Sequence, residues 1–259
     1  MSLTINTNIE ALNASRNLNS TETKISMAMQ HLSSGLKINS AADDVAGYAI
    51  SQSLTAQTNG LNQATENAQD AVALAQTAQG ALNDVEQMLQ RIRELSVQSE
   101  NGTTSEAGKT SIKEEQEQLT KEITRVAETT EFNGTKLLTG GAAIKFQIGA
   151  NEGKTEQIEV KAAEVKAPTE FKIGKIEEAI AEIAKAAGSF GAAQDRVQYA
   201  LSNTEIYSQN LASANSAISD VNMASEMTNF TKLNVLQSAG VAILAQANAQ
   251  PQSVLKLLE

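Results

Sequence analysis

The sequence predicts a mainly α protein: a long helical coiled-coil rod with a small β-hairpin region, in which the terminal helices pair as a second coiled coil. Only two of the 259 residues are proline, so long stretches are free to be helical. Aromatic residues make up 3% of the chain, which suits thin bundles of closely packed helices better than a thick core. Apolar residues recur every three, four or seven positions over most of the chain, as they do along helices that bury one face.

Both ends of the chain carry long amphipathic stripes. Residues 3–36 and 221–258 are polar and rich in alanine and asparagine, and aliphatic side chains recur along each segment. Steps of three and four residues predict one helical face for Met223, Met227, Phe230, Leu233, Leu236, Gly240, Ile243 and Ala247. Because chain termini usually fray, two such regular stripes predict that the end helices pair antiparallel with each other or pack on other copies of the chain.

A strict seven-residue repeat predicts the longest inner helix. One seam is Leu54, Leu61, Ala68, Ala75, Leu82 and Leu89, and the other is Gln57, Ala64, Ala71, Ala78, Val85 and Ile92. A sustained heptad predicts left-handed supercoiling against a partner helix, and alanine at both seams predicts a close approach at the middle. A second heptad runs from Ile176 to Ile218. Its polar seam residues, among them Gln194 and Asn215, suit a multi-helix assembly in which one side faces a neighbouring subunit.

A shorter helix is expected between the two repeats. It follows the loop at residues 101–104 and is expected to end near Phe132. Its inward-facing residues are Ile112, Leu119, Ile123 and Val126.

The apolar period then changes to two, which predicts a β-hairpin region at about residues 142–174. The first strand carries Ile144, Phe146 and Ile148, and the second carries Ile158 and Val160. Residues 161–174, around Pro168, are expected to form a loop or a further strand.

Two motifs could carry chemistry, and each has a simpler structural interpretation. The stretch Gly149–Thr155 resembles a phosphate-binding loop, but that motif needs four residues between its glycines and a helix after it. Here three residues separate Gly149 from Gly153 and a strand is expected next, so a hairpin turn is favoured. Asp43 and Asp44 are adjacent and do not share a helical face. Capping or a structural turn is therefore favoured for them over acid–base or metal chemistry.

The remaining composition excludes several classes of function. His31 is the only histidine and there is no cysteine, so neither a zinc site nor a catalytic triad can be assembled. We therefore expect no catalytic residue, no metal and no cofactor. The net charge of −10 argues against nucleic-acid binding. No apolar run approaches the length that spans a membrane, and the first 15 residues lack the features of a Sec signal.

Six segments of the chain closely resemble signatures of the bacterial flagellin family, in the family's order. They are LSSGLKINSAADDVAG at residues 32–47, QRIRELSVQ at 90–98, EFNGTKLL at 131–138, FQIGANEG at 146–153, LAQAN at 244–248 and PQSVL at 251–255. The resemblance implies a structural subunit that polymerises into the helical filament of the bacterial flagellum. It assigns residues 1–44 and 221–259 to an inner-core coiled coil that orders on assembly, and residues 45–220 to an outer-core rod with a hairpin. No outer variable domain is expected.

The terminal stripes themselves predict where the subunits touch. Burial of an apolar stripe against several neighbours, at roughly 25 cal/mol per Å² of apolar surface, offsets the cost of ordering the helices. Head-to-tail contacts that do not close into a ring produce an open helical polymer. The predicted polymerisation residues are Leu3, Ile5, Ile9, Leu18, Ile25, Leu32, Met227, Phe230, Leu233, Leu236, Ile243, Leu255, Leu257 and Leu258.

The resemblance also implies partners and a location. Export through the flagellar type III apparatus, with an export chaperone and a cap protein, would place the chain outside the cell in the filament. Contacts with the Toll-like receptor for flagellin would fall on Arg91, Leu95 and Glu115. The alternative is that Arg91 and Leu95 serve mainly subunit packing, and both roles are compatible. The tail at residues 254–258 matches the part that intracellular flagellin sensors recognise.

Three other functions remain as alternatives at this point. The first is a hook–filament junction protein, which resembles flagellin at its ends. The second is a phosphate-loop hydrolase that uses Lys154 and Thr155. The third is a generic intracellular coiled-coil scaffold.

Overall fold

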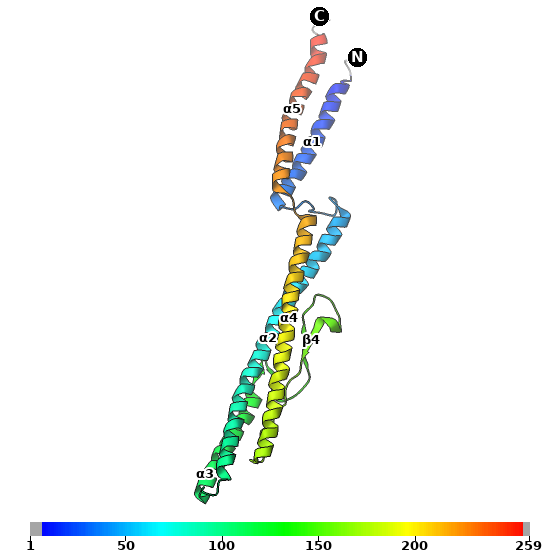
Figure 1. Cartoon of the computed structure of the whole chain (residues 1–259). Coiled ribbons are helices and arrows are strands. Elements are labelled where there is room, and N and C mark those ends of the chain that lie inside the picture. The colour runs from blue at the N-terminus through cyan, green and yellow to red at the C-terminus, as the bar shows by residue number, and fades with distance from the viewer. Residues whose placement is uncertain (1–6, 256–259) are drawn as a thin grey trace. The chain divides into compact units, whose positions relative to one another are not determined.

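The computed structural model describes residues 7–255, without the side chains of Lys154 and of residues 250–255. Within that range it contains five helices and two small antiparallel sheets, which confirms the predicted mainly α class. The helices are α1 (Ile9–Ser34), α2 (Val45–Ser99), α3 (Glu106–Thr129), α4 (Ile173–Ser219) and α5 (Met223–Leu255), as Figure 1 shows.

The chain divides into two compact units. One consists of Met1–Thr55 with Ala212–Glu259, and the other of Ala56–Leu211. The boundaries expected from the sequence, after residues 44 and 220, fall in the α1–α2 and α4–α5 connections. The first compact unit reaches further and includes the first residues of α2 and the last residues of α4.

The hydrophobic core belongs to the unit formed by Ala56–Leu211. Its one large cluster of buried apolar side chains lies between Ala68 and Val197. The other unit buries only five apolar residues among those described, namely Ala14, Ala28, Ile38, Leu233 and Ala247. Three of those five are alanines, so this unit has no comparable core of its own.

The heptad of α2 forms the inner face of the core, as predicted. Both of its seams are buried from Leu61 to Ile92. Helix α4 runs antiparallel to α2, because Arg93 pairs with Glu177 near one end and Asn62 pairs with Ser208 near the other. The alanines at the middle of both α2 seams are buried, and a Cβ on Gly191 of α4 would meet the end of the Gln79 side chain at 3.4 Å.

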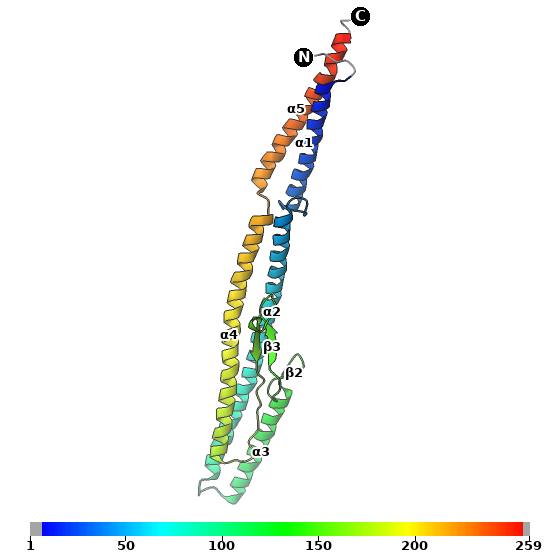
Figure 2. The same ribbon diagram turned by 90° about the vertical axis from the view of Figure 1, so that its right-hand side faces the viewer.

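Helix α3 folds back along α2. Its first amides are capped by Ser105, whose hydroxyl oxygen accepts from the Gly108 N–H at 3.2 Å. Inside the pair, the Gln116 side chain donates to the Ser96 hydroxyl at 2.8 Å, so the buried polar groups are satisfied. Figure 2 shows α2, α3 and α4 with strand β3 beside them.

The predicted end of α3 near Phe132 is wrong by three residues. The helix ends at Thr129, and strands β1 (Glu131–Phe132) and β2 (Thr135–Lys136) then form a small antiparallel hairpin. Its two turn residues, Asn133 and Gly134, have φ angles of 48° and 77°. Asparagine and glycine tolerate that left-handed backbone, so the Asn-Gly pair ends the helical pattern by forming the turn.

The second hairpin lies where the change of period predicts it. Strand β3 (Ile144–Gln147) pairs antiparallel with β4 (Gln157–Val160), and Phe146 stands opposite Ile158. The short 3₁₀ helix η1 (Lys154–Glu156) precedes β4. Residues 161–172 form no named strand, but the N–H groups of Ala163 and Val165 donate to the carbonyls of Leu137 and Leu138 at 2.9 Å.

Helices α1 and α5 lie side by side and antiparallel (Figure 1), which confirms the predicted pairing of the chain's ends. The Asn8 side chain donates to the Ala247 carbonyl at 2.7 Å at one end of the pair. His31 Nδ1 lies 3.7 Å from Glu226 Oε1 near the other end.

The connection from α1 to α2 is a tight, hydrogen-bonded turn. Helix α1 ends at Ser34 and is capped by Gly35, whose φ of 73° suits glycine and whose N–H donates to the His31 carbonyl at 2.9 Å. Asp43 then accepts hydrogen bonds from the N–H groups of Asn39 and Ser40. Asp44 accepts from two amides in the first turn of α2, both at 3.0 Å. The prediction that the two aspartates serve a turn and a cap is confirmed.

Candidate functional site

The largest group of exposed apolar side chains lies on the α1–α5 pair. Among the described residues, sixteen large apolar side chains are exposed, and ten of them belong to these two helices. Helix α1 contributes Ile9, Leu12, Met27 and Met29, and α5 contributes Met223, Met227, Val235, Leu236, Val241 and Ile243. A folded protein normally keeps such surfaces small, so this concentration marks an interaction site.

The contact between α1 and α5 buries little apolar surface. Its buried residues, among those whose side chains are described, are Ala14 and Ala28 on α1 and Leu233 and Ala247 on α5, so one large side chain is buried there. Gly240 faces Leu18 in this seam, and a Cβ there would make an ordinary contact with the Leu18 side chain at 3.5 Å. The pair therefore gains little from the apolar surface that it buries, and most of its large side chains remain available to other contacts.

The C-terminal stripe predicted as one face is wider than this seam. Phe230, Leu233, Gly240 and Ala247 are buried or half-buried, whereas Met223, Met227, Leu236 and Ile243 are exposed. Steps of three and four residues spread over more than a quarter of a helix surface, and a single partner helix covers only part of that arc. Half of the stripe thus faces away from α1.

The predicted polymerisation residues fall into three groups. Leu18, Ile25, Leu32, Phe230 and Leu233 are buried or half-buried, and Ile9, Met227, Leu236 and Ile243 are exposed. Leu3, Ile5, Leu257 and Leu258 lie outside the described residues, and Leu255 ends α5 without a described side chain.

Sequence reasoning missed five exposed apolar residues of the pair. They are Leu12, Met27, Met29, Val235 and Val241. Each lies outside the periodic apolar stripe of its helix, so a search for periodicity does not select it. They could have been found because the two helices contain more large apolar residues than a single buried stripe requires.

A second exposed site joins α2 and α3 through charged side chains. Arg91 Nη2 lies 3.0 Å from Glu115 Oε1, and Arg91 Nη1 lies 3.2 Å from Glu94 Oε2. Hydrogen bonds to Glu115, and then to Glu94, raise the pKa of the Arg91 guanidinium above its ordinary value. The side chains of Arg91 and Glu115 are about half exposed and that of Glu94 is 69% exposed, so the ion pairs contribute little stability and remain accessible.

Leu95 does not share this exposed surface. Only 2% of it is exposed, so it packs inside the unit one turn from Arg91. The structure thus brings together Arg91 and Glu115 of the predicted receptor contacts, whereas the third, Leu95, is buried.

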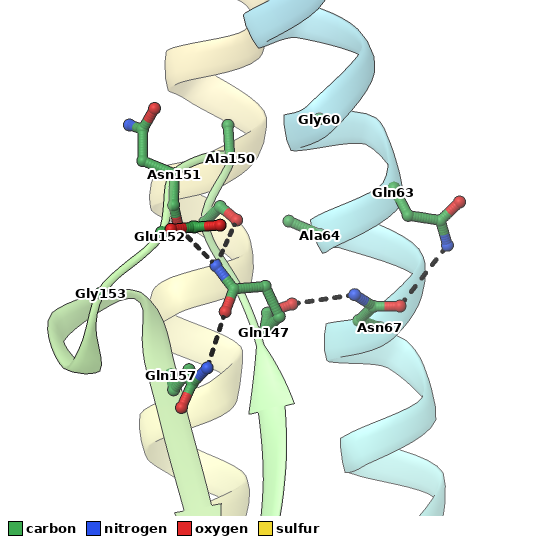
Figure 3. A pocket seen from close by; sticks show the side chains of 11 residues that line it. Gly60, Gln63, Ala64, Asn67, Gln147, Ala150, Asn151, Glu152, Gly153 and Gln157 are labelled. Atoms are coloured by element: carbon green, nitrogen blue, oxygen red, sulfur yellow. Dashed lines mark hydrogen bonds between the residues drawn. The ribbon is translucent and has the colours of Figure 1, made fainter.

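The loop between β3 and β4 is held by amide side chains, as Figure 3 shows. The Gln147 side chain donates to the carbonyls of Gly149 at 2.9 Å and Asn151 at 2.7 Å, and it accepts from Gln157 at 3.1 Å. Asn67 of α2 donates to the Gln147 carbonyl at 3.0 Å and ties the hairpin to the helix.

This loop lacks the framework of a phosphate site. The three-residue η1 and strand β4 follow it, where a phosphate-binding loop requires a helix. Space at Gly149 is occupied by Glu156, whose carboxylate would meet a Cβ there. The hairpin-turn interpretation is confirmed, and the hydrolase alternative loses its structural basis.

Two further properties concern the described part of the chain. No group of three or more potential metal-ligating side chains is gathered there. None of its helices combines the length and apolar character that crossing a membrane requires.

Family models match nearly the whole chain. Residues 5–143 match the bacterial flagellin N-terminal helical region, and residues 173–258 match the bacterial flagellin C-terminal helical region. The segment between the two matches contains the β3–β4 hairpin.

Individual relatives agree with the family models. The flagellin of Halalkalibacterium halodurans is 41% identical over 98% of this chain and 99% of its own length. The flagellar filament 33 kDa core protein of Treponema phagedenis is 38% identical over the same shares. A crystal structure of Bacillus cereus flagellin covers 54% of this chain and 88% of its own, with 30% identity and a TM-score of 0.49. The chain therefore belongs to the bacterial flagellin family, the structural subunits of the flagellar filament.

Proposed function

We propose that this flagellin polymerises through its α1–α5 pair, whose exposed apolar side chains pack against other copies of the chain in a helical filament. The observation that carries the proposal is the contrast within the pair. Among the described side chains of α1 and α5, ten large apolar ones are exposed, while the seam between the two helices buries one. A neighbouring copy of the chain is a suitable partner for this apolar surface, because it carries the same apolar stripes.

The proposal includes ordering of the terminal helices on assembly. An isolated helix gains little, because nucleation is unfavourable and a thin seam offsets it weakly. The unit that holds α1 and α5 buries only five described apolar residues. Contacts with several neighbours supply the missing burial, so folding of the ends and polymerisation are one coupled step.

Deletion of a terminal helix tests this proposal. Removal of residues 1–36 or 223–259 leaves intact the core cluster between Ala68 and Val197. We expect each truncated chain to remain a soluble, helical monomer by circular dichroism and sedimentation, and to form no filaments by negative-stain electron microscopy. Filaments from either truncated chain would overturn the proposal.

The match to flagellins over 98% of the chain favours a filament subunit over a hook–filament junction protein. The two functions differ in what the protein builds. A filament subunit forms long polymers by itself, whereas a junction protein forms short rings. Polymer length in electron micrographs separates them.

We also propose an extracellular location, reached through the flagellar type III export apparatus with an export chaperone and a cap protein. Family membership supports this, since the relatives are flagellar filament proteins. Deletion of the export apparatus in the source cell should retain the chain inside. Appearance of the chain in the medium of that strain would contradict the proposal.

The exposed α2–α3 site supports recognition of the monomer by the Toll-like receptor for flagellin. Arg91 and Glu115 present a charged pair from two helices, and the buried Leu95 fixes the backbone beside Arg91. Intracellular sensors are proposed to bind residues 254–258.

A matched pair of variants tests the receptor contact. Arg91→Ala removes the proposed contact, whereas Arg93→Ala removes an equally exposed ion pair, with Glu177 of α4. We expect receptor binding by the monomer to fall about tenfold or more for Arg91→Ala, as for a typical interface hot spot, and to remain unchanged for Arg93→Ala. Equal effects of the two variants would rule out a specific role for Arg91.

A further inference from the structure

The sulfur atoms of this chain are concentrated on the α1–α5 pair. The sequence has six methionines and no cysteine. Of the five methionines in the described residues, four lie on this pair: Met27 and Met29 on α1, and Met223 and Met227 on α5. Their exposed fractions are 43%, 56%, 47% and 49%. The fifth, Met88, is partly buried against the core of the other unit.

These four methionines all lie toward the same end of the α1–α5 pair. His31 of α1 faces Glu226 of α5, and each methionine lies within four residues of one of these two. Ala28, between Met27 and Met29, is almost fully buried, so the two thioethers flank the seam on either side. None of the four is packed into the seam itself.

We propose that this group is an oxidation site, at which peroxides convert the thioethers of the unassembled subunit to sulfoxides and thereby block filament assembly. The inference rests on the proposed function, because it requires that the exposed surface of the α1–α5 pair is covered in the filament. The four thioethers are exposed to solvent when α1 and α5 are paired. They are also exposed in a subunit whose terminal helices have not yet ordered.

The chemistry requires only an oxidant of the peroxide class. The methionine sulfur attacks one peroxide oxygen, the O–O bond breaks, and a sulfur–oxygen bond forms. Sulfur loses two electrons, hydrogen peroxide gains them, and the second oxygen leaves as water. The product is a polar sulfoxide in place of a flexible apolar side chain.

A sulfoxide opposes assembly because its oxygen needs hydrogen-bond partners. An apolar subunit contact offers none, so burying the group loses its hydration without compensation. The α1–α5 seam does not include these side chains, and Met88 lies elsewhere. Oxidation should therefore reduce assembly and leave the helices of the Ala56–Leu211 unit unchanged.

Oxidation of the monomer by hydrogen peroxide tests the proposal. Peptide mass spectrometry should find Met27, Met29, Met223 and Met227 oxidised before Met88. Yield of sedimentable filament from the oxidised monomer should fall about tenfold or more, from the cost of burying an unpaired polar group, with unchanged thermal unfolding of the core unit. Treatment with a mixture of methionine sulfoxide reductases A and B should restore assembly, since the two act on opposite sulfoxide epimers.

Two variants separate this group from other sites. The fourfold variant M27L/M29L/M223L/M227L keeps apolar side chains and should assemble after peroxide treatment. Met88→Leu should remain as sensitive as the parent chain. The reductase experiment on the parent chain keeps the test decisive where the fourfold variant assembles poorly before treatment.

The outcomes distinguish the inference from the proposed function. Normal assembly by fully sulfoxidised monomer would overturn the inference while leaving the polymerisation surface in place. Full oxidation of all four methionines in intact filaments, at the monomer's rate, would show that they are uncovered and would overturn both. Sensitivity that persists in the fourfold variant would assign the effect to another residue and overturn the inference alone.

Discussion

Single residues decide the turns and close approaches of this fold, and two glycines of α2 illustrate how. A Cβ on Gly60 would lie 3.0 Å from the Ala150 Cβ and 3.3 Å from its Cα, so the loop after β3 rests directly on the helix there. A Cβ on Gly80 would meet nothing within 4 Å. The sequence alone does not show which glycine is packed against another element, because both lie outside the seams of the same heptad. Only the hairpin's position does.

The two glycines give a matched prediction. Alanine at Gly80 should stabilise the core unit by about 0.5–1 kcal/mol, the usual gain in a helix interior. Alanine at Gly60 should forfeit that gain and destabilise the unit by roughly 1–3 kcal/mol, because the Ala150 backbone must shift. Urea unfolding of the two monomers measures the difference, and equal stabilisation by both substitutions would contradict the packing of the loop on α2.

Asp43 leads to a prediction about how the stability of the folded turn depends on pH. Hydrogen bonds from the Ser40 and Asn39 amides hold the pKa of its carboxyl below the ordinary value of 3.8. A depressed pKa means that the carboxylate stabilises the folded turn above pH 3.8, and that this contribution is lost as the pH falls through the lower, folded-state pKa.

The comparison with Asp43→Asn isolates that effect. Asparagine does not titrate, so filaments of this variant should be less stable near neutral pH and should show a weaker loss of stability below pH 3.8. Light scattering of filaments across an acid titration measures it. Parallel curves for the variant and the parent would mean that the Asp43 turn does not contribute.

At the scale of elements, the sequence predicts those features that depend on a regular apolar period within one segment. The heptad correctly predicted the buried face of α2, and the change to an apolar period of two correctly predicted the region of strands β3 and β4. The β1–β2 hairpin was missed, since its two-residue strands are too short for any periodicity to register. Which half of the α5 stripe faces α1 was also beyond the sequence, because that depends on the angle and register at which the two helices pair.

The outer half of the α5 stripe carries the prediction at this scale. Ile243 is 60% exposed and sits on a helix that buries little, so Ile243→Gln should leave monomer stability unchanged. It should nevertheless reduce the rate and yield of filament assembly, because a subunit contact loses apolar area. Ile243→Leu keeps that area and should assemble normally. Sedimentation of polymer after seeding compares them, and normal assembly of the glutamine variant would remove Ile243 from the contact surface.

At the scale of the whole molecule, the two compact units differ in how much apolar surface each buries within itself. The Ala56–Leu211 unit has a continuous core and satisfies its buried polar groups internally, as Gln116 and Ser96 do. The unit with α1 and α5 has a seam of alanines and an exposed apolar surface. The family resemblance predicted two parts with different roles, and that division of roles stays a prediction. The exposure of the four methionines on α1 and α5, and the burial of Leu95 one turn from the exposed Arg91, could be read only from the three-dimensional arrangement.

Hydrogen exchange tests most directly the claim that other copies of the chain complete the terminal helices. Amides of α1 and α5 should exchange rapidly in the unassembled subunit and slowly in the filament, whereas the core-facing amides of α2 and α4 should be protected in both. The core unit serves as the internal control within each sample. Strong protection of α1 and α5 in the unassembled subunit, equal to that of the core, would show that the helix pair is stable alone and would contradict the account.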